Sequence, residues 1–275
     1  MMRFIAAPAL TLIFLVTVDA QTPPAFTDRD RLAAATALCG GVTAGTARDE
    51  FGGKSKSTPG FVTQDKSTVC VELLAAPFRQ AGKSQQLIVL GGHRVAGGVI
   101  DHGQNAQTDV HVGVLEFRGG KWQMTSQGAS LTKTGYSGRN PTAALRKIGG
   151  DRHALELRSN LWSDGRSVSV VGLYDLRGAA PVELLNVVTD ADDCALIESC
   201  FAFEGAFRID AKPGTAAYEG SLALTGTYRD SQGRIIPLPA DASFAFRLIN
   251  GAYTPVLTTP ARRALWNAIQ SPWNR

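Results

Sequence analysis

The sequence lacks the short motifs by which several enzyme classes are found. A phosphate-binding loop needs a glycine five residues before Gly-Lys-Ser, but Arg48 and Pro77 stand at that distance before residues 53–55 and 82–84. The serine-hydrolase elbow needs a glycine two residues after its serine, and residues 135–139 place Arg139 there. No H-E-x-x-H stretch is present either. The first two absences argue against a phosphate-binding loop and a serine hydrolase, although catalytic groups that lie far apart in a sequence leave no such motif.

The chain also lacks a concentrated basic segment. It has 28 Lys and Arg against 24 Asp and Glu, a formal charge of +4. The basic residues are scattered, for example Arg79, Lys83, Arg118, Lys121, Lys133, Arg146 and Lys147. A nucleic-acid surface is typically a clustered basic patch with interleaved aromatic side chains. We therefore expect no nucleic-acid partner.

Beyond residue 20 there is no apolar run long enough to cross a membrane. Before it, an arginine at position 3 is followed by a mostly apolar run over residues 4–18, and Val18 and Ala20 suit a cleavage point. This order is typical of a secretory signal peptide, and its apolar part is shorter than the roughly 20 residues of a spanning helix. We expect residues 1–20 to be removed on export to the periplasm or the outside; an uncleaved anchor is the alternative.

The cysteines do not form the C-x-x-C motif that a redox pair prefers. Cys39, Cys70, Cys194 and Cys200 are an even set in a chain expected to be exported, which predicts two structural disulfides. Three pairings are open. Because local pairs form most readily, we favour Cys39–Cys70 and Cys194–Cys200.

A helical period in the hydrophobic pattern occurs only near the two ends of the exported chain. Thr27 can cap a helix that runs to Cys39, and Thr259 with Pro260 can begin a second one. Residues 43–60 are rich in Gly, Ser, Thr and Lys and are expected to form a loop.

Between the helices the pattern has a period of two, which is typical of strands. It is clearest over residues 201–210, and residues 250–251 (Asn-Gly) add a hairpin signal. We predict a mainly β protein, namely an antiparallel β-sandwich, an open barrel or stacked small sheets, with a short N-terminal helix and a short C-terminal helix. Residues 21–275 are expected to form a single exported domain, with a subdivision near 190–200 as the alternative.

Histidines are few, and three of the four lie close together in the sequence. His93, His102 and His111 are accompanied by Asp109, which is two residues from His111 at the start of an expected strand and can share its face. Imidazole and carboxylate are ligands that zinc accepts. These four residues are our candidate metal site. The alternative is that they are polar residues of glycine-rich loops.

A second cluster is acidic and surrounds the last two cysteines. Asp190, Asp192, Asp193 and Glu198 supply the hard oxygen ligands that calcium prefers. The spacing lacks the glycine and final glutamate of a known calcium loop. A solvated acidic loop closed by a small disulfide is the alternative interpretation.

Taken together, these patterns favour an exported protein of a bacterial-type envelope that binds another component without catalysis. The expected partner is an envelope protein or a glycan, and an inhibitor or immunity-type protein falls within this interpretation. No cofactor is predicted, with zinc and calcium kept as the metals that the two clusters would suit. The alternative function is a metal-dependent hydrolase that uses His93, His102 and His111. Nothing in the sequence indicates the oligomeric state.

Overall fold

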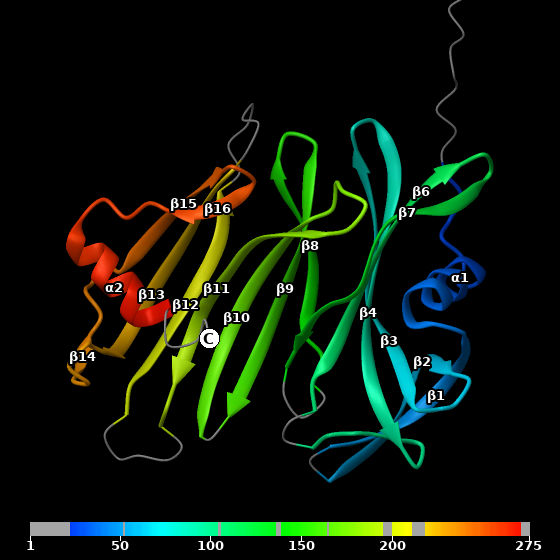
Figure 1. The fold of residues 1–275 in the computed structure, drawn as a ribbon, viewed down its shortest axis with the longest axis horizontal. Helices are drawn as coiled ribbons and strands as arrows, with labels where there is room; N and C mark the ends of the chain where they lie inside the picture. The colour runs from blue at the N-terminus through cyan, green and yellow to red at the C-terminus, as the bar shows by residue number, and fades with distance from the viewer. Residues whose placement is uncertain are drawn as a thin grey trace, which may run out of the picture.

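The computed structural model describes residues 23–51, 53–103, 106–135, 139–163, 165–194, 200–210 and 218–270. The predicted signal peptide and Glu198 lie outside these residues. The predicted fold class is confirmed: the described chain is mainly β, with one helix near each of its ends (Figure 1).

Seven strands form the first sheet, in the order β3-β2-β1-β5-β4-β6-β7. β3 also pairs with β4, so that β1 to β5 close into a small barrel-like ring. The strands are β1 (Val42–Phe51), β2 (Lys54–Thr63), β3 (Thr68–Gln80), β4 (Lys83–Ala96), β5 (Val99–Ile100), β6 (Thr108–Arg118) and β7 (Lys121–Thr134).

The second sheet lies beside the first and runs in the order β16-β15-β13-β12-β11-β10-β9-β8, with β14 paired to β13 (Figure 1). Its strands are β8 (Thr142–Gly149), β9 (Arg152–Ser163), β10 (Arg166–Asp175), β11 (Val182–Asp192), β12 (Ala202–Asp210), β13 (Glu219–Arg229), β14 (Ile235–Pro237), β15 (Ser243–Ile249) and β16 (Ala252–Pro255). The hairpin predicted at residues 250–251 joins β15 to β16, and both residues have positive φ, as a tight two-residue turn requires.

The loop predicted for residues 43–60 is wrong, because this segment forms β1 and most of β2. The two strands pair without interruption from Val42 opposite Thr63 to Phe51 opposite Lys54. Much of β2 is exposed, so the ladder of backbone hydrogen bonds rather than an apolar face supports it. Polar strands of this kind give no alternating hydrophobic pattern for sequence reasoning to find.

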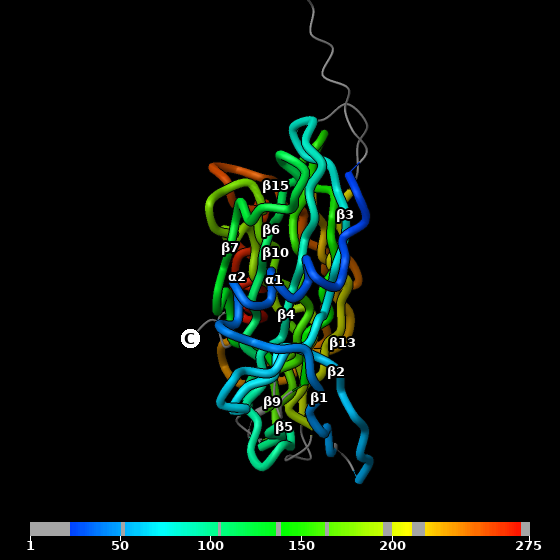
Figure 2. The backbone as a smooth tube through the Cα atoms, turned by 90° about the vertical axis from the view of Figure 1, so that its right-hand side faces the viewer, coloured from blue at the N-terminus to red at the C-terminus, as the bar shows by residue number. Residues whose placement is uncertain are grey.

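The N-terminal helix begins where the sequence predicted. In α1 (Asp28–Cys39) the Thr27 side chain accepts from the backbone of Asp30, and the Asp30 carboxylate accepts from the backbone of Thr27. The helix buries Ala34, Ala35 and Leu38 against β4 and β6. Figure 2 looks from this end of the molecule and shows α1 lying in front of the first sheet.

Both predicted disulfides are confirmed. Cys39 at the end of α1 is bonded to Cys70 of β3. Cys194 is bonded to Cys200 between β11 and β12. The first bond joins the N-terminal helix to the sheet, and the second joins a residue that follows β11 to a residue that precedes β12.

The C-terminal helix, α2 (Pro260–Gln270), packs on the second sheet. Its Trp266 ring lies edge-on to Phe244 and Phe246 of β15, with ring centroids 5.0 and 5.6 Å apart. At its end, the buried side chain of Gln270 accepts from the backbone N–H of Val188 at 2.8 Å and donates to the Val188 carbonyl at 3.0 Å. β11 pairs with β12 only at residues 191 and 192, so no described strand pairs with Val188 on that side. The Gln270 side chain makes the two backbone hydrogen bonds that a neighbouring strand would otherwise make.

One hydrophobic cluster contains side chains of both sheets. Its members from β3, β4 and β6 pack against members from β9 and β10, and almost all are nearly inaccessible to solvent. The cluster consists of Phe78, Leu87, Val89, Val110, Val112, Val114, Leu155, Leu157, Tyr174 and Leu176. Burial of this shared set joins the two sheets.

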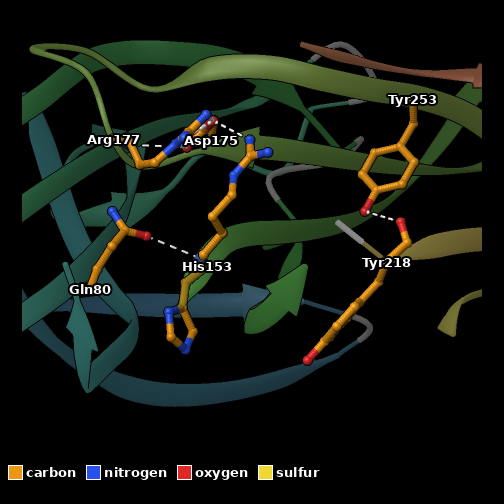
Figure 3. A network of polar contacts seen from close by, with 7 residues as sticks. Gln80, His153, Asp175, Arg177, Tyr218 and Tyr253 are labelled. Carbon is orange, nitrogen blue, oxygen red and sulfur yellow. Dashed lines mark hydrogen bonds and ion pairs between the residues drawn. The ribbon is translucent and has the colours of Figure 1, made fainter. Parts of the chain in front are cut away.

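Polar contacts line one margin of the same junction (Figure 3). Gln80 at the end of β3 accepts from the backbone N–H of His153 in β9 at 3.0 Å, and the N–H of Ala81 donates to Asp151. Nearby, the buried Asp175 carboxylate accepts from Arg152 at 2.9 Å and from Arg177 at 2.8 Å. Burial alone would raise the pKa of Asp175, but the hydrogen bonds from Arg177 and Arg152 hold that pKa below its ordinary value of 3.8.

We expect Gln270→Leu to destabilise the protein by about 2–4 kcal/mol, because it leaves the buried N–H and carbonyl of Val188 without partners. Urea denaturation followed by tryptophan fluorescence measures this change. Arg263→Leu on the exposed side of the same helix is the control and should change the free energy of unfolding little. Equal effects of the two substitutions would contradict the role given to Gln270.

We expect Asp175→Asn to cost about 2–4 kcal/mol at neutral pH, because two guanidinium groups lose their buried anionic partner. The stabilisation by Asp175 is fully present above its ordinary pKa and is lost as pH falls through the lowered pKa. The difference between wild type and variant should therefore shrink below about pH 4, as urea denaturation at several pH values would measure. A difference that stays constant from pH 7 to pH 3 would contradict this.

Candidate functional site

Three of the four candidate metal residues line a pocket beside the first disulfide. The pocket has a volume of about 660 Å³. Its walls come from β3, β4, β6, β7, the end of α1 and the segment that follows β5. They include Cys39, Cys70, His93, Arg94, Asp101, Asp109, His111 and Lys133, and we call it the disulfide pocket.

Asp109 and His111 share a face of β6, and one residue of β7 holds both. The backbone N–H of Ser130 donates to Nδ1 of His111 at 3.1 Å, and the Ser130 hydroxyl donates to the Asp109 carboxylate at 2.6 Å. Burial lowers the pKa of His111, and the nearby Asp109 charge only partly opposes this. The ring is therefore neutral at physiological pH, with its Nδ1 atom already occupied by Ser130.

His93 lies on the other face of its strand. Leu90 of β4 pairs with His111 and Gly92 pairs with Asp109, so residues 90 and 92 share the face of the β6 pair. His93 is the next residue and points the opposite way, where its Nε2 atom lies 2.8 Å from Oδ1 of Asn140. The residue is 2% exposed, and burial lowers its pKa. Its Nδ1 atom is buried with no hydrogen-bond partner in the described chain.

His102 follows β5 and is held by β1. Its Nε2 atom lies 2.8 Å from Oδ1 of Asp49, whose other oxygen lies 3.2 Å from Nζ of Lys56. Burial would raise the pKa of Asp49, but the hydrogen bonds from Lys56 and His102 lower it. His102 is thus paired with a carboxylate that the sequence reasoning did not connect with it.

The three histidines do not converge. In the described ranges, two groups of His, Cys, Asp or Glu have all their ligand atoms within 4.8 Å of one another, namely Cys39 with Cys70 and His111, and Asp193 with Cys194 and Cys200. Both groups contain a disulfide, whose sulfurs are not thiolate ligands. Zinc bound by His93, His102, His111 and Asp109 stays a prediction that this placement does not favour.

The acidic cluster is already hydrogen-bonded within the protein. Asp190 accepts from the Thr189 hydroxyl, Asp192 from the Ser167 hydroxyl, and Asp193 from the backbone of Phe201 and from Arg229. These bonds occupy the three carboxylates within the protein, so calcium at this cluster stays a prediction that the contacts do not favour.

A larger pocket lies between α2 and the second sheet. It has a volume of about 1250 Å³, and its apolar lining includes Phe244, Leu265, Tyr228 and Ile236. Three alanines of α2 face it, at positions 261, 264 and 268. We call this the α2 groove. Most pockets for small molecules have volumes of about 300–1,000 Å³, so the α2 groove suits a larger occupant.

The charged side chains of the α2 groove are paired, with one exception. Arg262 donates to Asp241 and to the Ser243 carbonyl, and Arg234 donates to Asp230 from outside the groove. Arg229 contacts Asp193 at 3.0 Å and lies over the Phe201 ring. Arg166 is exposed and has no hydrogen bond or ion pair within the part of the chain that the structure describes. An anionic group entering the α2 groove would therefore meet one free guanidinium.

Sequence reasoning did not find the α2 groove. It predicted the C-terminal helix but not which residues would lie opposite it. The groove joins residues 166, 228–244 and 259–268, and the fold alone brings these segments together. The small and large residues of the C-terminal helix gave the sequence reasoning a signal of a contact surface. They do not indicate which segment of the chain lies opposite that surface.

Comparisons with protein-family models, with curated proteins and with solved structures found no match to this chain. No helix in the described part of the chain combines the length and the apolar composition that crossing a membrane requires. The chemistry of the α2 groove and of the disulfide pocket is therefore what supports a function.

Because the histidine ligand atoms do not converge, we expect zinc to bind neither tightly nor stoichiometrically to the oxidised protein. Isothermal titration at micromolar zinc should give no saturable heat, and His102→Ala should behave like wild type. Stoichiometric binding that the His102→Ala substitution abolishes would instead support the metal site.

Proposed function

We propose that this chain is an exported, non-catalytic binding protein that holds a segment of another envelope protein in the α2 groove. The observation that carries this proposal is a large groove with an apolar floor and, at its margin, Arg166, whose side chain has no ion pair among the described residues. Two disulfides support a location in an oxidising compartment.

The charged groups of the groove support binding rather than catalysis. Its two carboxylates, Asp230 and Asp241, are both ion-paired with arginines, at 2.7 and 3.3 Å. A carboxylate held by a guanidinium is a poor general base, because the cation favours the charged form that the base must give up on accepting a proton. The hydroxyls of Ser231, Ser243 and Thr259 have no histidine beside them in the groove lining.

The lining favours a peptide segment over a glycan. The floor is built from Phe244, Leu265 and the alanine side of α2, which suits apolar side chains. Polar groups at the margin, such as Asn267 and Ser231, can bond the backbone of an extended or helical segment. Arg166 adds a preference for a carboxylate next to the apolar residues.

A panel of labelled apolar decapeptides, each with a single Asp and each paired with an Asn counterpart, tests this proposal by fluorescence anisotropy. We expect the Asp peptides that bind to do so about tenfold more tightly than their Asn counterparts. Arg166→Gln should remove this difference, whereas Arg263→Gln, on a part of α2 outside the groove, should retain it.

A photo-crosslinking residue placed at Ala264, inside the groove, or at Arg263, outside it, then tests the site in the cell envelope. We expect discrete protein adducts from position 264 that are lost with Arg166→Gln, and none from position 263. Adducts with acyl chains or glycans, or peptide binding that ignores Arg166, would overturn the proposal.

A further inference from the structure

The disulfide pocket, which is separate from the α2 groove, contains a disulfide beside a histidine. Cys39, Cys70 and His111 line it, and their sulfur and imidazole atoms lie within 4.8 Å of one another. Cys70 is fully buried, whereas Cys39 is partly exposed at the end of α1. A thiol that enters the pocket therefore meets the sulfur of Cys39 first.

The hydrogen bonds of His111 decide which of its nitrogens faces the disulfide as a donor. Nδ1 accepts the N–H of Ser130, so the neutral ring carries its proton on Nε2. Nε2 lies over Gly92, 2.9 Å from the point where a β-carbon of that residue would be. Gly92 is paired with Cys70, so Nε2 lies on the face of the sheet that also carries the Cys70 side chain. A metal at Nε2 would need the opposite tautomer, whose Nδ1–H would oppose the N–H of Ser130.

The two sulfurs differ as leaving groups. Cys39 ends α1, where the negative end of the helix dipole disfavours a thiolate, and the last turn of α1 has no basic residue. Cys70 lies in β3 beside the N–H of His111, and a hydrogen bond to the charged form stabilises a thiolate. Burial of Cys70 opposes a charge on its sulfur, so the proposal depends on the N–H of His111 to stabilise the electron pair there.

We propose that the Cys39–Cys70 disulfide is a thiol–disulfide exchange site for a dithiol, with His111 as the hydrogen-bond donor to the departing Cys70 sulfur. One thiolate of the dithiol attacks Cys39, a new S–S bond forms, the Cys39–Cys70 bond breaks, and its electron pair goes to Cys70. The second thiolate of the dithiol then attacks the first dithiol sulfur in the mixed disulfide, which forms the S–S bond of the oxidised dithiol, and the electron pair of the broken bond goes to Cys39. The dithiol loses two electrons and two protons, and the two cysteines take them up.

The second disulfide provides an internal comparison. The sulfurs of Cys194 and Cys200 lie within 4.8 Å of a carboxylate oxygen of Asp193 rather than of an imidazole. A nearby negative charge disfavours a thiolate, so this disulfide lacks the feature that the proposal assigns to His111.

The first experiment uses the wild-type oxidised protein and a monothiol, 2-mercaptoethanesulfonate, with alkylation by N-ethylmaleimide and peptide mass spectrometry. We expect the mixed disulfide on Cys39 and the alkylated thiol on Cys70. A mixed disulfide on Cys70, or no adduct on either residue, would overturn the proposal. This measurement does not depend on any variant folding.

The second experiment measures the rate at which dithiothreitol reduces each disulfide in three proteins. His111→Leu should slow reduction of Cys39–Cys70 about tenfold, because the donor to the leaving sulfur is lost. His111→Gln retains an N–H donor and should stay within about threefold of wild type. Reduction of Cys194–Cys200 should be the same in all three. An unchanged Cys39–Cys70 rate in His111→Leu, or parallel changes at both disulfides, would refute the role of His111.

Discussion

The packing of side chains between the two sheets is the constraint on which the rest of the structure depends. Valines of β4 and β6 meet leucines of β9 in a cluster that excludes water, and Tyr174 and Leu176 close it from β10 and the residues that follow it. Neither sheet presents a complete apolar core at this margin alone. The hydrogen bonds from His153 to Gln80 and from Ala81 to Asp151 then fix the relative position of the sheets.

Both pockets depend on this arrangement through the strands that pass from the junction to the ends of the molecule. β4 and β6 extend from the shared cluster to the disulfide pocket, where Gly92, Asp109 and His111 lie. On the other side, β10 begins at Arg166 in the α2 groove and ends at Asp175 in the junction. The polar and charged side chains of the two pockets are therefore positioned largely by long, regular strands.

Much of the fold could be read from the sequence, and the exceptions have physical causes. Thr27, Thr259 and the Asn-Gly pair are local signals, and each marked the element that the structure contains. The disulfides followed from the rule that near neighbours pair. β1 and β2 were missed because their support is a backbone ladder, which leaves no trace in the alternation of side chains.

The candidate sites were less predictable, because they depend on strand register and on contacts between distant segments. Asp109 and His111 share a face because they are two residues apart, as local geometry required. The face of β4 on which His93 lies depends on the register between β4 and β6. In the structure Gly92 is opposite Asp109, so His93 lies on the other face. The partners Asn140, Asp49 and Ser130 lie far from their histidines in the sequence, and so does Arg166 from α2.

The two helices lie at opposite ends of the row of strands (Figure 1). The α2 groove is beside one helix, and the Cys39–Cys70 bond is beside the other. A molecule seated at one end does not cover the other, so the two proposed sites do not compete for the same surface. On the two proposals made above, occupancy of the α2 groove and the oxidation state of Cys39–Cys70 would combine in four ways within one chain.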